Sequence, residues 1–239
     1  MKKNTLIVTS SWDDGVATDL KLGLLLQKYK VKGTFYVSRL ATDDLLKPED
    51  IVSLGKDFEI GSHTMNHPVL TGIPLYEAKT EIKSSKEYLQ QLLGHPVDMF
   101  CYPDGRYNLA VKQIVKESGF TGARTCIPGG FDPPDDNFEW HMTFLTSNGS
   151  PLMALKIFLN ACLLNPAALF DWEARGKSLF DKALHRGGVY HIYGHSLELE
   201  TNNEWPKLER LLAYVSGKEN VLYLTNSEVL EYFRNNRSR

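Results

Sequence analysis

The sequence alternates between strand-like and helix-like segments along almost its whole length, and this alternation limits the folds open to it. Short apolar or β-branched runs are typical of buried strands, and longer segments with apolar residues at helical spacing are typical of helices. The expected strands are 6–8, 33–37, 58–61, 97–102, 121–125, 141–145, 188–193 and 221–224. The expected helices are 19–30, 48–54, 74–93, 108–118, 152–164, 177–185, 205–216 and 225–234.

Such alternation is typical of parallel strands joined by crossover helices, because a tight turn cannot join two parallel strands. The chain of 239 residues holds about seven or eight such strand–helix units, which suits a closed barrel. Only the segment 127–139, rich in Pro, Gly and Asp, is expected to be an irregular loop. The sequence therefore predicts an α/β fold, a single distorted (β/α)7-8 barrel in which residues 1–239 form one domain.

Charge and cysteine content exclude several classes of protein. The 27 basic and 29 acidic residues nearly balance, so no nucleic-acid partner is expected. The three cysteines are odd in number and widely spaced, which argues against a disulfide framework and against a Cys-based zinc site. The apolar run after Lys2 and Lys3 is too short for a signal peptide, and no stretch is long enough to span a membrane. We therefore expect a cytoplasmic protein.

Polar motifs follow four of the expected strands directly. Asp13-Asp14-Gly15 follows the first strand, and the segment His63 to His67 follows the third. The turn Tyr102 to Gly105 and the late His195 follow two further strands. In a parallel barrel these strand ends meet on one face, where such enzymes carry their active sites. The sequence thus predicts one polar site built from four separate loops.

The two histidines of the second motif suggest a metal site. His63 and His67 are four residues apart, but Thr64 stands where the helical His-Glu-x-x-His motif has its glutamate. Pro68 disfavours a helical His67, so the pair is expected on a loop. Two histidines and a carboxylate would give three ligands for zinc or a similar divalent ion, with a position open for water. The alternative interpretation is a turn residue beside a hydrogen-bonded core histidine.

In order along the chain, these motifs resemble those of the polysaccharide deacetylase family, which carries the chitooligosaccharide deacetylase (NodB) homology domain. The matching segments are Ser11-Trp12-Asp13-Asp14-Gly15, His63-Thr64-Met65-Asn66-His67, Phe100-Cys101-Tyr102-Pro103-Asp104-Gly105 and His195. They extend over about residues 6–196. The resemblance implies a distorted (β/α) barrel and a metal-dependent hydrolysis of an N-acetyl group on a sugar.

The resemblance also implies roles for individual residues. Asp13 would be the general base that takes a proton from the metal-bound water, and His195 would be the general acid for the departing amine. The backbone N–H of Tyr102 would help to stabilise the oxyanion. The implied metal ligands are Asp14, His63 and His67. The expected substrate contacts are Trp12, Pro103, Trp140 and Tyr193.

The sequence departs from the family pattern at several of these positions. Cys101 stands where an arginine often orients the catalytic base, which leaves Arg106 and Arg124 as candidate orienting residues. His191 is a rival to His195 for the acid role, because strand alternation places both on one side of the strand. Glu198 and Glu200 follow closely and are interpreted as solvated loop carboxylates rather than substrate ligands.

Three functions are compatible with these residues. The first is a metal-dependent hydrolase that removes an N-acetyl group from an amino sugar in an oligosaccharide, a polysaccharide or a glycan precursor. The second is a hydrolase of another C–N bond, such as that of a cyclic ureide, because the same site could attack any polarised amide. The third is a non-catalytic carbohydrate-binding protein. Asp13 and His195 favour an enzyme, with an acetylated sugar as its substrate and one divalent ion as its cofactor.

Overall fold

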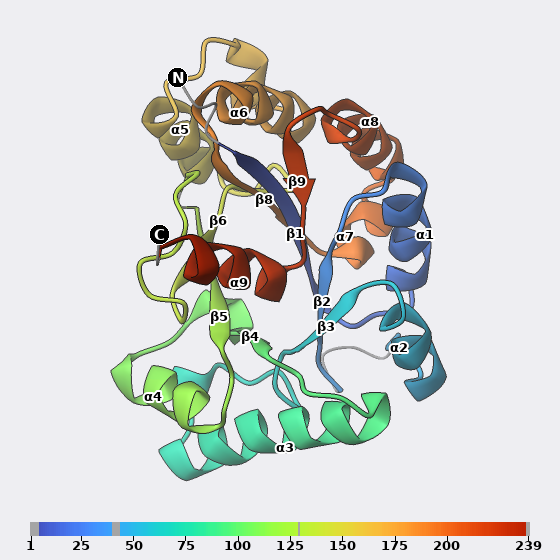
Figure 1. The fold of residues 1–239 in the computed structure, drawn as a ribbon, viewed down its shortest axis with the longest axis vertical. Helices are drawn as coiled ribbons and strands as arrows, with labels where there is room; N and C mark the ends of the chain where they lie inside the picture. Colours follow the sequence, from blue (N-terminus) through green and yellow to red (C-terminus); the bar gives the residue numbers. More distant parts are fainter. Residues whose placement is uncertain (1–4, 40–43, 129, 238–239) are drawn as a thin grey trace.

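The structure, a computed structural model, describes residues 5–39, 44–128 and 130–237 and is a nearly closed α/β barrel (Figure 1). The described residues contain nine strands in one sheet, in the order β6-β5-β4-β3-β2-β1-β8-β7, with β9 pairing to β1. The strands are β1 (Leu6–Asp14), β2 (Thr34–Val37), β3 (Glu59–Ser62), β4 (Met99–Cys101), β5 (Gly122–Pro128), β6 (Trp140–Met142), β7 (Phe144–Leu145), β8 (Gly188–Gly194) and β9 (Val221–Tyr223). All the pairings between them are parallel, which confirms the predicted fold class.

The barrel closes through the short strands β6 and β7, which are separated by a single residue, Thr143. Strand β6 pairs with β5, whereas β7 pairs with β8. The N–H of Thr143 donates to the carbonyl of His191 on β8, at 2.9 Å. The segment 140–145 therefore connects both edges of the sheet, and this connection brings β8 beside β5 across the barrel interior.

Helices surround the strands (Figure 1) and bury their apolar faces against the outer side of the sheet. The helices are α1 (Asp19–Tyr29), α2 (Pro48–Leu54), α3 (Leu75–Leu93), α4 (Leu109–Glu117), α5 (Pro151–Asn160), α6 (Trp172–Arg186), α7 (Ser196–Thr201), α8 (Trp205–Val215) and α9 (Asn226–Arg237). Their ends follow local chemistry. Asn108 caps α4 by accepting the N–H of Val111, and α3 ends at Gly94, whose φ of 76° suits glycine.

The last helix, α9, closes the N-terminal end of the barrel and crosses the front of the strands in Figure 1. It begins with the predicted capping pair, in which the N–H of Thr225 donates to Glu228 at 2.8 Å. Side chains of α9 and of the strands form a small apolar cluster inside the barrel: Ile7, Tyr36, Met99, Cys101, Trp140, Val189, Val229 and Leu230. The N-terminal end of the barrel is thereby filled, which leaves the C-terminal strand ends for the polar motifs.

Several predicted boundaries were wrong. Helix α6 begins at Trp172, five residues before the expected start at Lys177. Strand β5 continues to Pro128, into the segment expected to be loop. Glu198 and Glu200, interpreted as loop carboxylates, lie in helix α7. That residues 1–239 form one domain stays a prediction.

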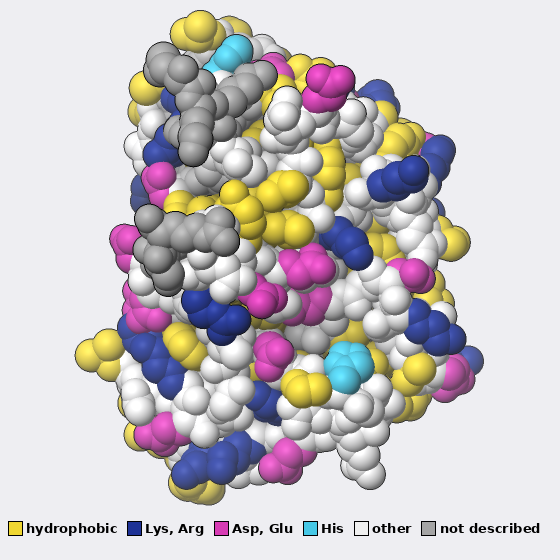
Figure 2. All heavy atoms as spheres, viewed as in Figure 1, with side chains coloured by type: hydrophobic (Ala, Val, Ile, Leu, Met, Phe, Trp, Pro, Cys, Tyr) yellow, Lys and Arg dark blue, Asp and Glu magenta, His cyan; other side chains and the backbone are white. Residues whose placement is uncertain are grey.

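The surface and the helices agree with the composition. Acidic and basic side chains are interspersed over the face shown in Figure 2, as the near balance of 27 basic and 29 acidic residues predicts. Among the described residues, no helix combines the length and the apolar character needed to cross a bilayer.

Candidate active site

The site starts at the C-terminal end of β1, where the chain leaves the sheet with two adjacent carboxylates. Asp13 still pairs in register with Tyr36 of β2 and is almost fully buried. Asp14 has a φ of 83°, a left-handed conformation that costs a non-glycine residue about 1–3 kcal/mol. Gly15, at φ 73°, follows so close to Val37 that a Cβ would lie 2.8 Å from its side chain. This turn directs the two carboxylates to different places, with Asp13 inside the barrel and Asp14 at its rim.

The histidine pair comes from the loop after β3, and its backbone is also constrained. Thr64 and His67 both have positive φ, at 65° and 54°. The hydroxyl of Thr64 accepts the N–H of His67 at 3.1 Å, which holds the loop in a tight turn. Nδ1 of His63 lies 2.9 Å from the carbonyl oxygen of Cys101. Because a carbonyl only accepts, Nδ1 carries the proton and Nε2 is left with a free lone pair.

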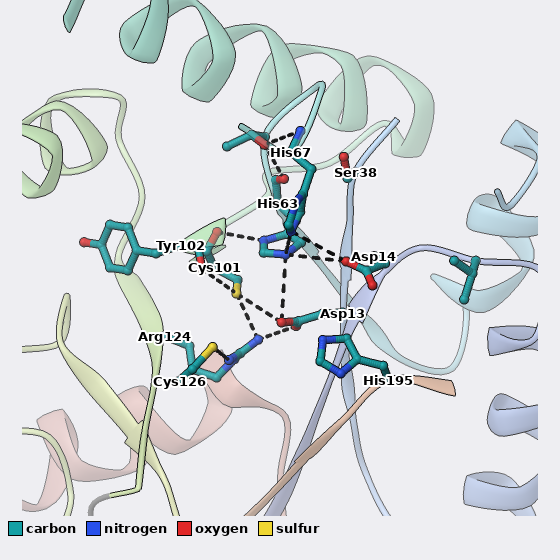
Figure 3. Close-up of polar contacts among 12 residues, drawn as sticks. Asp13, Asp14, Ser38, His63, His67, Cys101, Tyr102, Arg124, Cys126 and His195 are labelled. Atoms are coloured by element: carbon teal, nitrogen blue, oxygen red, sulfur yellow. Dashed lines mark hydrogen bonds and ion pairs between the residues drawn. The ribbon is translucent and has the colours of Figure 1, made fainter. Parts of the chain in front are cut away.

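The three predicted metal ligands point to one place (Figure 3). Nε2 of His63 and Nε2 of His67 are 3.0 Å apart, and each lies within 3.8 Å of Oδ1 of Asp14. Ligands about 2.0–2.1 Å from one tetrahedral ion lie about 3.3 Å from each other, so this spacing fits a single zinc-sized ion. A second group that could hold a metal, Asp13, His63 and Cys101, shares His63 and lies deeper in the barrel.

Of the two candidate orienting arginines, Arg124 is the one that lies beside Asp13. It comes from β5, is fully buried, and its guanidinium binds Oδ1 of Asp13. The same nitrogen lies 2.9 Å from Sγ of Cys101, the residue found where the family often has its arginine. Burial alone would raise the pKa of Asp13, but Arg124 and the neighbouring histidines hold that pKa well below its usual range. Asp13 is therefore an ionised carboxylate held in one orientation.

His195 lies on the other side of Asp13 from the histidine pair (Figure 3). Its Nε2 is 3.1 Å from the hydroxyl of Tyr193, and its Nδ1 is 3.5 Å from a carboxylate oxygen of Glu198. Burial lowers the pKa of His195, but Glu198 and the charges of Asp13 and Asp14 outweigh burial and raise it above its ordinary value. Glu198 is exposed, as expected of a solvated carboxylate, but it lies on helix α7 rather than on a loop, and the helix turns it towards His195. A His three residues before a Glu is the signal that sequence reasoning could have used.

His191, the rival to His195, lies deep inside the barrel. Its Nε2 is 2.5 Å from Oγ of Ser11, its Nδ1 is 3.1 Å from the carbonyl oxygen of His141, and its ring packs on Trp140. Burial, followed by the charge of Arg124, lowers the pKa of His191 to about 3. A histidine that stays neutral and has both nitrogens occupied is poorly suited to donate a proton to a substrate.

Two of the four expected substrate contacts were wrong. Trp12 faces outward from β1 into the core and donates its indole N–H to Ser10, and it is fully buried. Trp140 is 1% exposed, because it fills the barrel interior rather than the rim. Tyr193 does reach the site, where its ring stacks on the guanidinium of Arg124 at 4.2 Å. Pro103 is also buried, in the turn that follows β4, and its contact with substrate stays a prediction.

The backbone N–H of Tyr102 has a partner within the sheet. It donates to the carbonyl of Arg124 at 3.3 Å, near the upper limit for such a bond. Tyr102 lies beside Cys101, close to the histidine pair in Figure 3. Its role at an oxyanion stays a prediction, and it requires this long bond to open when a substrate binds.

Comparison with known proteins agrees with this geometry. The profile of the family described as polysaccharide deacetylase matches residues 2–123, about half of the chain, including both carboxylates and both histidines. The chain belongs to the polysaccharide deacetylase family. Peptidoglycan-N-acetylmuramic acid deacetylase PdaC of Bacillus subtilis is 28% identical over 116 residues, which are 47% of this chain and 24% of PdaC. Peptidoglycan-N-acetylglucosamine deacetylase of Bacillus cereus is 30% identical over 122 residues, 49% of this chain and 55% of that protein.

The matched part of this chain spans 24% of the length of PdaC and 55% of the length of the Bacillus cereus protein. The fold of this family member is shared with solved structures over nearly the whole chain. The chitin deacetylase of the fungus Colletotrichum lindemuthianum superimposes with a TM-score of 0.65 at 15% identity, covering 95% of this chain and 88% of that one. The structure of PdaC superimposes with a TM-score of 0.57 at 18% identity, covering 100% and 96%. Both comparisons show that this chain has the family barrel.

Proposed function

We propose that this protein is a metal-dependent hydrolase that removes an N-acetyl group from an amino sugar. The observation that carries the proposal is the convergence of Asp14, His63 and His67 within metal-ligand spacing, next to the buried Asp13–Arg124 pair. Its membership of the polysaccharide deacetylase family supports the substrate class. The curated relatives act on peptidoglycan sugars, by their names, and we extend to this chain only the acetylated amino sugar.

The donor set fits one divalent ion, and we propose zinc. Two imidazole nitrogens and one carboxylate oxygen are ligands that zinc accepts in catalytic sites, where a fourth position is open. His63 is prepared for this role, because its Nδ1–H is bound to the carbonyl of Cys101 and burial lowers its pKa. When bound, the ion would supply positive charge that acidifies a water molecule and polarises the substrate carbonyl.

The chain's own residues would divide the proton transfers between two side chains. Asp13, kept ionised by Arg124, would accept the proton of the attacking water. His195, whose raised pKa lets it keep its proton to a higher pH than an ordinary histidine, would donate that proton to the departing amine. Tyr193 holds Nε2 of His195 at 3.1 Å, so the leaving nitrogen would have to replace this hydroxyl. A low pKa on one group and a raised pKa on the other suit base-then-acid hydrolysis.

The test combines metal analysis with a substrate panel. Purified protein is expected to bind about one zinc per chain and to release acetate from N-acetylated amino sugars, and a chelator should abolish that activity until zinc is restored. A His63→Ala variant should lose both metal and turnover. Hydrolysis of a cyclic ureide without acetate release from any sugar would favour the alternative C–N hydrolase. Sugar binding without turnover by the zinc-loaded protein would favour the non-catalytic function.

A further inference from the structure

The base and the acid of the proposed reaction come from neighbouring strands, and the backbone ladder between these strands stops just before them. Strands β1 and β8 pair in register from Leu6 with Gly188 to Trp12 with Gly194. Asp13 and His195 are the next residues on each side. Beyond this point β1 and β8 no longer pair, so side chains help to determine how far His195 lies from Asp13.

Asp19 provides such a connection. It is the first residue of α1, and its side chain is fully buried. Oδ1 accepts the hydroxyl of Ser196, the residue after His195, at 2.6 Å. Oδ2 accepts the N–H of Val16, which belongs to the loop that begins with Asp14, at 3.2 Å. One carboxyl group therefore joins the loop of the base to the loop of the acid.

The hydroxyl of Ser196 is bonded on both sides. Besides donating to Asp19, it lies 2.7 Å from the hydroxyl of Thr18, the N-cap residue of α1. Gly194, just before His195, has no space for a side chain, because a Cβ would lie 1.9 Å from the hydroxyl oxygen of Thr146. The acid loop is thus confined on one side by Thr146 and tied on the other to Thr18 and Asp19.

The burial of Asp19 has a cost that packing alone does not explain. Burial raises the pKa of this carboxyl to about 8, and no ion pair to it is found among the described residues. An acidic residue in the first turn of a helix is ordinarily favoured by the helix dipole, but it gains this at the surface, in contact with water. The hydrogen bonds from Ser196 and Val16 offset part of the free-energy cost of removing the Asp19 carboxyl from water.

We propose that Asp19 is a positioning residue that fixes the general acid His195 relative to the base Asp13 through Ser196. The proposal rests on the proposed function. Asp19 acts on the acid alone, because it bonds to Ser196 next to His195, and no hydrogen bond or ion pair joins its side chain to the three proposed metal ligands, all of which are described residues. Loss of Asp19 should therefore impair proton donation to the leaving group while the metal and the base stay in place.

The test compares two acetyl substrates with the zinc-loaded protein. An N-acetyl amino sugar needs a proton on its leaving nitrogen, whereas 4-nitrophenyl acetate releases an aryl oxide that needs none. Asp19→Ala is expected to lower kcat for the amide about 10- to 100-fold, with KM changed less than about threefold, because misplacing a group by 1 Å costs about 10²-fold. Its rate on the ester and its zinc content should stay within about threefold of the wild type.

Two further variants make the result decisive. Ser196→Ala removes the same bond from the other side and should move the amide-to-ester ratio in the same direction, even if Asp19→Ala folds poorly. Glu59→Gln is the control, because Glu59 is a half-buried carboxylate that accepts hydrogen bonds from Thr34 and Ser227 and makes none to the His195 segment. It should leave the ratio unchanged.

The outcomes separate this proposal from the proposed function. Equal loss on amide and ester in both Asp19→Ala and Ser196→Ala, or unchanged amide rates in both, would overturn the positioning role alone. A wild-type protein that hydrolyses neither substrate would overturn the proposed function and the positioning role with it. A selective loss of amide hydrolysis, matched in kind by His195→Ala, supports the proposal.

Discussion

Polar side chains are buried at both ends of the barrel, and their partners differ. At the end closed by α9, Asn226 accepts hydrogen bonds from Ser11 and Tyr36 and donates one to Thr9, all at 2.8–2.9 Å. At the open end, Asp14 faces the lone-pair nitrogen of His63 at 3.8 Å, with His67 beside it. Donors are paired with acceptors at the closed end, whereas a carboxylate oxygen and two imidazole nitrogens face one another at the open end.

The paired groups at the closed end contribute to stability, whereas the groups at the open end are arranged for function. A buried polar group that is fully paired contributes to one defined fold, and its loss leaves its partners unsatisfied. Acceptor atoms that face one another need a cation, and their constrained backbone is retained at a cost of about 1–3 kcal/mol per strained residue. Asp14, Thr64 and His67 all carry this strain at the open end. Variants at the two ends should therefore change different quantities.

The largest effect is expected from Asp13→Asn at the open end. The amide cannot accept a proton from water, so kcat for acetate release should fall by about 10²–10⁴-fold, the usual contribution of a general base. Bound zinc should stay, because Asp14, His63 and His67 are unchanged. Metal analysis and acetate assays on the same sample check both parts. Full activity would remove Asp13 as the base and leave the open end without a catalytic assignment.

Arg124→Met tests whether the ion pair between Asp13 and Arg124 also stabilises the fold. Removing the guanidinium leaves the Asp13 carboxylate buried without its main partner, which should lower the free energy of unfolding by about 3–5 kcal/mol in urea titrations. The pKa of Asp13 should rise, so the rate should fall at a higher pH on the acidic side than in the wild type. The double variant Asp13→Asn with Arg124→Met should lose less stability than the sum of the two single variants. Simple additivity would contradict the pairing.

The sequence predicted the open end better than the closed end. Asp13, Asp14, His63 and His67 lie within short contiguous motifs, so local spacing and the order of strands sufficed to bring them together. Arg124 remained one of two candidates, because its contact with Asp13 joins positions 111 residues apart on different strands. Trp140 was misplaced, because an aromatic residue beside a loop has the same local pattern at a rim and inside a barrel.

Helix boundaries show the same limit. Helix α6 starts at Trp172, and Gly176 in its first turns hid this start from the sequence pattern. The glycine is needed there, since a Cβ would lie 2.8 Å from the ring of Phe144 on β7. Helix α7 is only six residues long, too short for a periodic apolar pattern. Packing between distant segments determines where α6 begins and that α7 forms, and a single sequence does not reveal such packing.

Asn226→Ala tests the closed end. The substitution removes the partner of three buried groups, so the free energy of unfolding should fall by about 1–3 kcal/mol. The value of kcat should stay within about twofold of the wild type, because the open end keeps all its side chains. Asn236→Ala, on the exposed surface of the same helix, is the matched control and should change stability by less than about 0.5 kcal/mol. A large loss of kcat in Asn226→Ala at unchanged stability would show that the two ends are coupled.

The smallest effect is expected from Glu198→Gln, which changes a charge at the open end without touching the metal ligands. His195 must be protonated to act as an acid, so the rate falls as pH rises through its pKa. Glu198 contributes to raising that pKa, and its neutralisation should move the alkaline side of the pH–rate profile to lower pH. An ion pair this exposed is worth about 0.2–1 kcal/mol, which corresponds to a shift of about 0.2–0.7 pH unit. Glu200→Gln, two residues further on α7, is the control, because Glu200 pairs with Lys21 instead. If both variants shifted the profile equally, His195 would not be the group whose proton limits the rate.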